Sequence, residues 1–340
     1  MPAVSFHGVT IAWEDRGAPR DPLREMLAGF PRVPAPAGGG VRFELRAAGE
    51  GAKAHPRGEG WEPSFFHGAV ETFRNERGFL IWDTVSRVLV PPAGGTIEAE
   101  IAPATAETTP GSTTIAIQIA LILALRPAGF FHLHAAALVL PSGVPVIVVG
   151  GSGAGKTTTT LALLEPSADG SPGAEFLCDD SIYLTRGAHE GALRLVSLPR
   201  EFHVGATTLA MFPRLEGFAG PRPSHTPKRA VDPRAAYPGR AREEITLRGG
   251  GGEMAIALFP SIEERAVTEV APLARAEAFG RLLGSSGALV VEGVPGREEN
   301  LAALRALLGC VRCYDVRLGK DAIGDPVRAI AERVAGLSSR

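Results

Sequence analysis

Alternating apolar and polar positions dominate the first 110 residues. Several runs there have the two-residue period of strands that bury one face, and they have strand-like lengths. The runs are Val4–Glu14, Val41–Ala47, Phe79–Thr84 and Ser86–Val90. Stretches rich in Pro and Gly separate them, as expected for turns. We therefore predict a β-rich N-terminal domain over residues 1–110. It carries no chemical motif, which favours a structural or oligomerisation module and leaves a homo-oligomer open.

From residue 111 onwards, helix and strand patterns alternate. Residues 112–126 form an apolar run that Gly129 ends. This run is too short to span a bilayer, which takes about 20 apolar residues, so we predict a buried helix. Two strand-like segments, His134–Leu140 and Pro145–Val149, follow on either side of a Pro-Ser-Gly turn. They predict a hairpin and hence a mixed sheet. We therefore predict an α/β (α+β) domain over residues 111–340.

Further elements are predicted toward the C-terminus. Glu175–Asp180 is predicted as a strand that ends in two carboxylates, and the next two runs are expected to pair around a Gly-containing turn. These runs and the later elements are Ile182–Thr185, Leu193–Val196, Met254–Phe259, Ala274–Leu283, Ala288–Val291, Glu298–Leu308, Cys313–Leu318 and Pro326–Val334. Residues 213–242 hold six prolines, seven Arg or Lys and two acids. This composition predicts a mobile basic loop without regular structure.

Composition narrows the function classes. The chain has 340 residues, of which 45% are hydrophobic and 21% charged, and a formal net charge of −2. These values predict a packed core and no overall attraction to nucleic acid or membranes. The N-terminus lacks the pattern of a signal peptide, and three cysteines fit a reducing compartment better than a disulfide framework. We expect a cytoplasmic protein with no nucleic-acid or membrane partner.

A glycine-rich motif surrounds one of only four lysines. The stretch Gly150-Gly151-Ser152-Gly153-Ala154-Gly155-Lys156-Thr157 matches G-x-x-x-x-G-K-[ST] in full. A β-branched strand precedes it and a helix over residues 157–164 is predicted after it, which is the context that the motif requires. Its backbone N–H groups and the helix N-terminus attract phosphate oxygens. We predict an ATP site in which Lys156 bridges the β- and γ-phosphates and Thr157 coordinates Mg²⁺. Thr158 is included among the nucleotide-binding residues.

Two carboxylates follow the strand over residues 175–178. Asp179 and Asp180 stand at its carboxyl end, where open sheets bind their ligands. One of them can hold Mg²⁺, and the other can orient or deprotonate an acceptor hydroxyl. Their adjacency leaves open which residue takes which role. Lys228 and Arg229, in the basic segment, are predicted to complete the positive charge around the γ-phosphate.

Together these elements resemble the HPr kinase/phosphorylase family and its kinase-like relatives, which share a fold with phosphoenolpyruvate carboxykinase. The similarity runs from His134 to Leu184 and includes His134-Ala135, the glycine-rich motif and Leu177-Cys178-Asp179-Asp180. It implies a P-loop kinase domain with a mixed sheet of that type, preceded by a smaller β-rich domain.

The same resemblance implies roles for the site residues. Lys156 would grip phosphate, Thr157 and Asp179 would serve Mg²⁺, Asp180 would be the acid/base group, and His134 would support Asp180. The Asn- and Arg-containing helical motif of HPr kinases is not recognisable here, so the resemblance does not fix the acceptor.

Three functions remain open. The first is an ATP- and Mg²⁺-dependent kinase that phosphorylates a serine-type hydroxyl of a protein, peptide or small molecule. The second is a metabolic enzyme like phosphoenolpyruvate carboxykinase, which needs a metal site with Lys and His ligands that four lysines hardly supply. The third is a regulatory or assembly module that binds ATP without phosphoryl transfer. The choice between ATP and GTP stays open as well.

Overall fold

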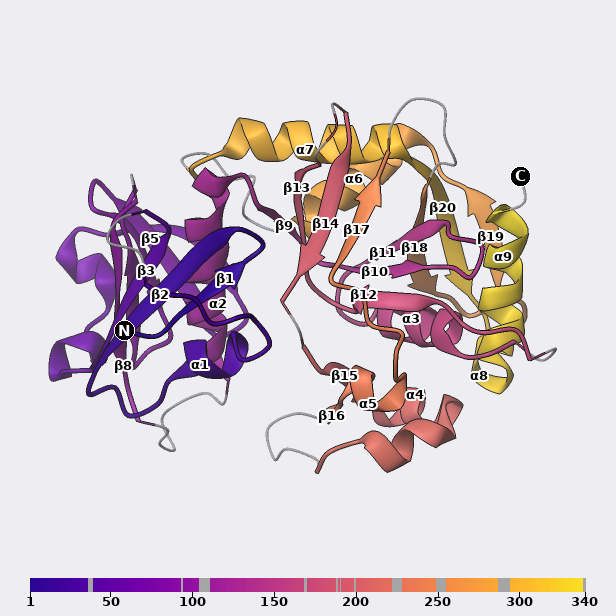
Figure 1. The fold of residues 1–340 in the computed structure, drawn as a ribbon, viewed down its shortest axis with the longest axis horizontal. Coiled ribbons are helices and arrows are strands. Elements are labelled where there is room, and N and C mark those ends of the chain that lie inside the picture. The colour runs from indigo at the N-terminus through magenta and orange to yellow at the C-terminus, as the bar shows by residue number, and fades with distance from the viewer. Residues whose placement is uncertain are drawn as a thin grey trace. The chain divides into compact units, whose positions relative to one another are not determined.

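The chain forms two compact units, seen here in a computed structural model. The structure describes residues 1–35, 39–92, 94–103, 111–167, 170–187, 189, 191–198, 200–221, 228–248, 255–286 and 294–338. One unit comprises Met1–Phe131 and Ala288–Arg297, and the other comprises His132–Gly287 and Glu298–Arg340. Both units contain strands and helices (Figure 1), and the fold is mixed α/β. The helix predicted over residues 112–126 falls in the first unit, and the domain division at residue 110 stays a prediction.

The first unit is built on one sheet of eight strands. Their spatial order is β1-β2-β3-β8-β7-β6-β5-β4. The strands are β1 (Ala3–Phe6), β2 (Val9–Arg16), β3 (Val41–Ala47), β4 (Glu62–His67), β5 (Val70–Asn75), β6 (Gly78–Trp82), β7 (Arg87–Val90) and β8 (Thr96–Ile101). β2, β3 and β8 run parallel, and the other neighbours run antiparallel. Its described helices and helical turns are α1 (Pro22–Met26), η1 (Glu50–Lys53), η2 (Pro56–Glu59), α2 (Ser112–Leu125) and η3 (Arg126–Ala128).

The structure divides one predicted strand into a hairpin. The run Val4–Glu14 turns at His7 and Gly8, where φ is 45° and 94°, so that β1 pairs with β2. The apolar positions change phase at this turn, from 4 and 6 before it to 9, 11 and 13 after it. β4, β5 and β8 lie outside the predicted runs. β8 contains Glu and Ala, which are depleted in strands, so its local sequence does not predict a strand. It forms a strand because it pairs with β3 and β7.

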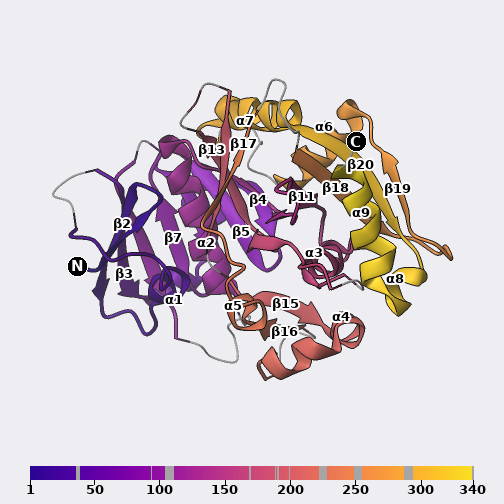
Figure 2. The same cartoon turned by 45° about the vertical axis from the view of Figure 1, so that its right-hand side comes forward.

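The predicted apolar helix is α2, and Gly129 follows it in the left-handed conformation, with φ of 79°. α2 packs against β5, β6, β7 and β8, and α1 also contacts it, so it is apolar on most sides. It lies across the sheet in Figure 2. Within the described ranges, no helix combines the length and apolarity that a membrane crossing requires.

The second unit contains a mixed sheet of six strands in the order β12-β10-β11-β18-β20-β19. A four-stranded sheet, β17-β14-β13-β9, and the two-stranded ribbon β15-β16 accompany it. The strands are β9 (Phe131–Leu133), β10 (Ala135–Val139), β11 (Pro145–Val149), β12 (Glu175–Cys178), β13 (Ile182–Arg186), β14 (Leu193–Ser197), β15 (Phe202–Gly205), β16 (Lys228–Val231), β17 (Glu244–Leu247), β18 (Ala255–Ile262), β19 (Glu269–Pro272) and β20 (Val311–Leu318). The described helices are α3 (Lys156–Leu164), α4 (Ala206–Met211), η4 (Pro213–Phe218), α5 (Pro233–Ala236), α6 (Arg275–Ser285), α7 (Arg297–Cys310), α8 (Asp321–Gly324), η6 (Val327–Ala331) and α9 (Glu332–Ser338).

Several sequence predictions for this unit are confirmed. β10 and β11 form the predicted antiparallel hairpin, while β11, β18 and β20 run parallel, so the sheet is mixed. β13 and β14 pair antiparallel, as predicted for the runs at 182–185 and 193–196. The strand predicted at 288–291 falls outside the described residues. The other elements predicted after residue 250 appear within a few residues of their predicted bounds.

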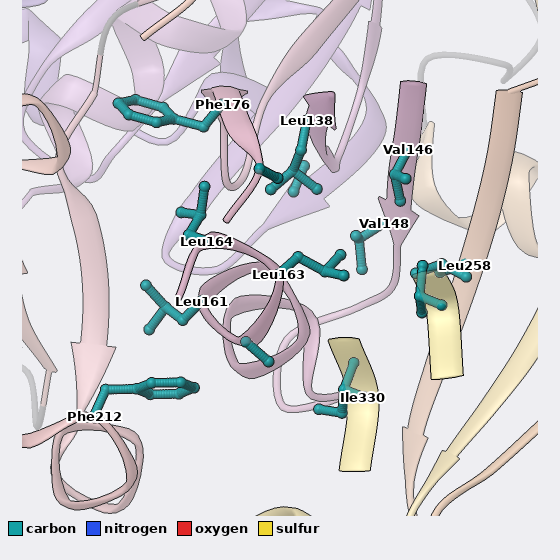
Figure 3. Packing of buried hydrophobic residues seen from close by; sticks show 14 of the residues in the cluster. Leu138, Val146, Val148, Leu161, Leu163, Leu164, Phe176, Phe212, Leu258 and Ile330 are labelled. Atoms are coloured by element: carbon teal, nitrogen blue, oxygen red, sulfur yellow. The ribbon is translucent and has the colours of Figure 1, made fainter. Parts of the chain in front are cut away.

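A buried cluster beneath α3 holds this unit together. Figure 3 shows Leu161, Leu163 and Leu164 of α3 among side chains from the strands, including Val148 of β11 and Leu258 of β18. α6 covers the opposite face of the sheet, since the guanidinium of Arg281 lies 5.9 Å from the ring centroid of Phe259. The core therefore fixes the start of α3 against the ends of the parallel strands.

The basic, Pro-rich segment at 213–242 is more regular than predicted. It contains η4, β16 and α5, while residues 222–227 lie outside the described part of the chain. β16 forms because its Val231 enters the cluster beneath α3 beside Phe202 and Val204 of β15. Prolines at 213 and 233 occupy the first turns of η4 and α5, where the missing N–H costs no helical hydrogen bond. Tertiary packing thus overrides the loop-forming composition.

Candidate functional site

The glycine-rich motif forms a tight connection between β11 and α3. β11 ends at Val149, and α3 begins at Lys156. Gly153 and Gly155 have φ of 81° and 95°, which favours glycine at both positions. A Cβ atom on Gly155 would meet the end of the Leu318 side chain, so glycine also allows close packing there. Residues 151–153 are exposed. The loop thus presents backbone to solvent at a helix N-terminus, an arrangement suited to anions.

Lys156 connects this loop to the carboxylate pair. Its side chain is only 7% exposed. The ammonium Nζ donates a hydrogen bond of 2.6 Å to Oδ1 of Asp180 and one of 3.1 Å to the backbone carbonyl of Asp179. The fold therefore brings together three residues that the sequence predicted for one site. A charge-assisted contact this short holds the lysine in a defined place.

The two adjacent carboxylates have opposite pKa shifts. Both residues directly follow β12, and Asp179 is buried, with 4% exposure. Burial, together with the neighbouring charge of Asp180, raises the pKa of Asp179 to about 7. Burial also acts to raise the pKa of Asp180, but the positive charges of Lys156, His134 and Arg200 outweigh it and lower that pKa to about 2. Neighbouring groups whose environments drive their pKa values apart are typical of catalytic sites.

His134 and Arg200 complete the surroundings of Asp180. His134 lies between β9 and β10, and its Nδ1 is 3.4 Å from Oδ1 of Asp180. Nη1 of Arg200 is 3.9 Å from the other carboxylate oxygen, Oδ2. Sequence reasoning missed Arg200, since one arginine among 31 carries no signal of its own. Its position just after β14, whose partner β13 follows the aspartates, is the feature that could have indicated it.

The ribbon β15–β16 places Lys228 and Arg229, the two cations predicted near the γ-phosphate, on opposite faces. Lys228 and His203 share the exposed face of the ribbon, because the register pairs Lys228 with Gly205 and His203 with Ala230. Burial lowers the pKa of His203, and the charges of Arg200, Asp180 and Lys228 also act on it. The exposed face that carries Lys228 is therefore close enough to the carboxylate pair to share its electrostatic field.

Arg229 is placed differently from its prediction. Its Nε donates to the carbonyl of Gly220 and its Nη2 to that of Ala219, each at 2.8 Å, while its Nη1 bonds Glu216. These contacts use all three nitrogens to hold η4 against β16. In this arrangement strand alternation turns the side chain of Arg229 away from that of Lys228, and its contact with phosphate stays a prediction.

The hydroxyls at the start of α3 supply the remaining candidate ligands. Thr157 is partly exposed in the first turn, and Oγ1 of Thr158 lies 3.4 Å from Oγ1 of Thr208 in α4. Within the described ranges, no group of three or more His, Cys, Asp or Glu side chains is placed to hold a metal. A hydroxyl and one carboxylate nevertheless fit Mg²⁺, which prefers oxygen and takes its other ligands from water and phosphate. The raised pKa of Asp179 is consistent with a carboxylate that needs a nearby cation.

Comparisons with known proteins do not show a family for this chain. No family model matches the chain, and no curated protein matches it. Among solved structures, the chain is similar to the Hpr(Ser) kinase/phosphatase from Coxiella burnetii, at 10% sequence identity and a TM-score of 0.28. That alignment covers 61% of this chain and 97% of the other. A likeness of this size carries no functional argument, so any function has to be argued from the site itself.

Proposed function

We propose that this protein is an ATP- and Mg²⁺-dependent phosphotransferase acting on a serine-type hydroxyl. The observation that carries this proposal is the 2.6 Å contact between Lys156 of the glycine-rich loop and Asp180. It joins a phosphate-binding cation to a candidate acid/base group within one site. The acceptor would be a protein, a peptide or a small molecule, and the second unit would be a kinase domain of the HPr kinase type.

The nucleotide would bind at the loop from Gly150 to Thr158. Backbone N–H groups and the start of α3 would hold the phosphates, and Lys156 would leave Asp180 to contact the β- and γ-phosphates. Thr157 and Asp179 would hold Mg²⁺, which neutralises phosphate charge when it is bound.

Phosphoryl transfer would then use Asp180. In the present arrangement Lys156 contributes to keeping the pKa of Asp180 near 2, which makes this carboxylate a weak base. When Lys156 turns to the phosphates, Asp180 loses its shortest contact, so its pKa rises and its oxygen becomes free to accept a proton. The acceptor oxygen would form a bond to the γ-phosphorus, the bond from that phosphorus to the bridging oxygen would break, and ADP would leave. His134 and Arg200 would hold Asp180 in place during this exchange.

A phosphoryl-transfer assay with γ-labelled ATP tests this function. The acceptors would be a panel of Ser-containing peptides, proteins and small hydroxyl compounds. We expect Asp180→Asn to lower the transfer rate by about 10²–10⁴-fold while nucleotide binding persists. Asp325→Asn is the matched control, because Asp325 is exposed and caps a helix by accepting from the N–H of Arg328.

The same assay separates the alternative of a module that binds ATP without transfer. Such a module would bind Mg²⁺·ATP but would label no acceptor, and Asp180→Asn would leave its nucleotide turnover unchanged. Equal rates in the wild type and Asp180→Asn would remove the catalytic role of this carboxylate.

A further inference from the structure

The carboxyl ends of three parallel strands lie along one edge of the six-stranded sheet. β11, β18 and β20 are neighbours that run in the same direction. The glycine-rich loop leaves the end of β11, so the ends of β18 and β20 lie on one side of that loop. Strand β12, which leads into Asp179 and Asp180, lies on its other side, beyond β10. β12 and β20 are each two strands from β11, or about 10 Å at ordinary strand spacing.

The side of the loop toward β18 is apolar. Leu258 packs beneath α3, and alternation along β18 directs Pro260 and Ile262 to the same face. Both reach the glycine-rich loop. A Cβ atom on Gly150 would be 3.7 Å from Cγ of Pro260, and one on Gly155 would be 3.5 Å from Cγ1 of Ile262. The end of β18 therefore lines the loop with hydrocarbon from its first glycine to its last.

Residues 263–268 cross the end of β20 and add a second apolar side chain. Glu263 donates its N–H to the carbonyl of Leu318 at 3.0 Å, and Lys320 donates to the carbonyl of Arg265 at 2.9 Å. The backbone of Val267 packs against Gly319, where an added Cβ atom would approach it to 2.7 Å. Val267 thus lies at the same strand ends as Ile262.

These two side chains are exposed although they are large and apolar. Ile262 is 67% exposed and Val267 is 53% exposed, while Leu318 between their segments is buried. Exposed aliphatic side chains beside a phosphate-binding loop offer a surface for a flat, apolar ring, because ligand sites combine apolar walls with a few polar groups.

We propose that Ile262 and Val267 form a base platform, the surface on which the base of the bound nucleotide lies. This inference rests on the proposed function and fixes the direction of the nucleotide. The γ-phosphate points toward Asp179 and Asp180 beyond β12, and the base points the opposite way, over the ends of β18 and β20. Strand order supports this direction, since the aspartate pair and the two exposed apolar side chains lie on opposite sides of one loop. The charged side chains beside Ile262 and Val267 pair with one another, as Arg265 does with Glu269.

The test compares ATP with inorganic tripolyphosphate, each with Mg²⁺, by calorimetry on the full chain. Tripolyphosphate carries the phosphates without a base. We expect the wild type to bind ATP more tightly, and we expect Ile262→Ser with Val267→Ser to weaken ATP binding by about 5- to 30-fold. Tripolyphosphate binding should stay the same. Phe66→Ser is the matched control, because Phe66 is 63% exposed on β4 of the other unit.

The outcomes separate the base platform from the proposed function. Unchanged ATP affinity in the double variant would overturn the platform and leave the phosphate site standing. An equal loss for ATP and tripolyphosphate would also overturn it, because the two residues would then support the loop instead of the base. If the wild type bound neither ligand, the proposed function itself would fail. Thermal unfolding of each variant, and the milder Ile262→Ala, guard against a general loss of fold.

Discussion

The two units bury aspartates in opposite ways. In the first unit, Asp83 is fully buried and accepts four hydrogen bonds. The donors are the N–H groups of Val85 and Ser86 and the hydroxyls of Ser112 and Thr113. In the second unit, Asp179 is almost as buried, but no other residue in the described ranges donates a hydrogen bond to its carboxylate.

This difference separates a structural carboxylate from one held ready for a ligand. Asp83 ties the start of α2 to the end of β6, and its oxygens are saturated. Asp179 is desolvated beside a second negative charge, an arrangement that costs stability and that a bound cation would relieve. A buried carboxylate with a raised pKa beside other charged groups is typical of a functional site, whereas burial alone is not.

Removing Asp83 should have the largest effect on stability. Asp83→Ala leaves several buried donors without an acceptor, so we expect the first unit to lose about 3 kcal/mol or more. Tryptophan fluorescence during urea unfolding reports this unit selectively, because all three tryptophans lie within residues 13–82. Asp83→Asn keeps the shape and one acceptor oxygen, and it should lose less. A shift in the unfolding midpoint no larger than that of Asp15→Asn, at an exposed aspartate of the same unit, would contradict the structural role.

Asp179→Asn should raise the stability of the second unit, whereas Asp83→Ala lowers that of the first. The pKa of Asp179 is about 7 when folded, whereas the ordinary pKa of an aspartate, 3.8, applies when the chain is unfolded. Between these values the folded state retains a proton that the unfolded state has lost, so the wild type loses stability as pH rises from 4 to 7. The Asp179→Asn variant does not lose stability in this range, because its amide has no proton to release. At pH 8 we expect its free energy of unfolding to exceed that of the wild type by on the order of 2 kcal/mol. Hydrogen exchange in β12 and α3 measures this, and a less stable variant would be the contrary result.

The pH dependence of nucleotide binding tests whether Asp179 holds a cation, as its difference from Asp83 suggests. Asp179 must be ionised to hold Mg²⁺, so Mg²⁺-dependent ATP affinity should fall by up to about tenfold per pH unit below 7 and level off above it. The Asp179→Asn variant should bind Mg²⁺·ATP more weakly at pH 8, and its affinity should not fall in this way below pH 7. Any pH dependence that remains in the variant comes from the titration of ATP itself and can be subtracted. The same pH profile in both proteins would show that Asp179 is not the titrating group.

The smallest expected effects distinguish Lys228 from Arg229. Lys228→Ala should lower kcat by about tenfold with less change in ATP affinity, because a cation near the transferred γ-phosphate acts mainly in the transition state. Arg229→Ala should leave kcat near the wild-type value and lower stability by about 1–3 kcal/mol, since it frees η4 from β16. Single-turnover rates and thermal unfolding decide between them, and the reverse pattern would restore Arg229 to the site.

Sequence patterns predicted the parts of the fold that local periodicity determines. The hairpin of β10 and β11, the buried helix α2 and the mixed sheet were all predictable, because each follows from a run of apolar positions and a turn. The turn at His7 and the strand β16 were not. β16 exists because Val231 enters a core built by distant segments, and a Pro-rich local composition contains no trace of that contact.

The candidate site was predictable where residue types are rare and spaced by a motif. Lys156 was predictable because it lies in a glycine-rich motif, and the two aspartates were predictable because they follow the end of an apolar strand. Arg200 and the different placements of Lys228 and Arg229 depend on which face of a strand each residue occupies. That choice is set by pairing with β15 and by packing, and it is not encoded in residue type.

Calorimetric titration of Mg²⁺·ATP into the wild type and Lys156→Ala tests the central claim most directly. The claim is that the loop from Gly150 to Thr157 binds the phosphates of a nucleotide. We expect the variant to lose about 10- to 150-fold in affinity, because it lacks charge-assisted hydrogen bonds and leaves Asp180 facing the phosphates. Lys53→Ala, in the first unit, should bind like the wild type. Equal ATP affinity in the wild type and Lys156→Ala would contradict the account.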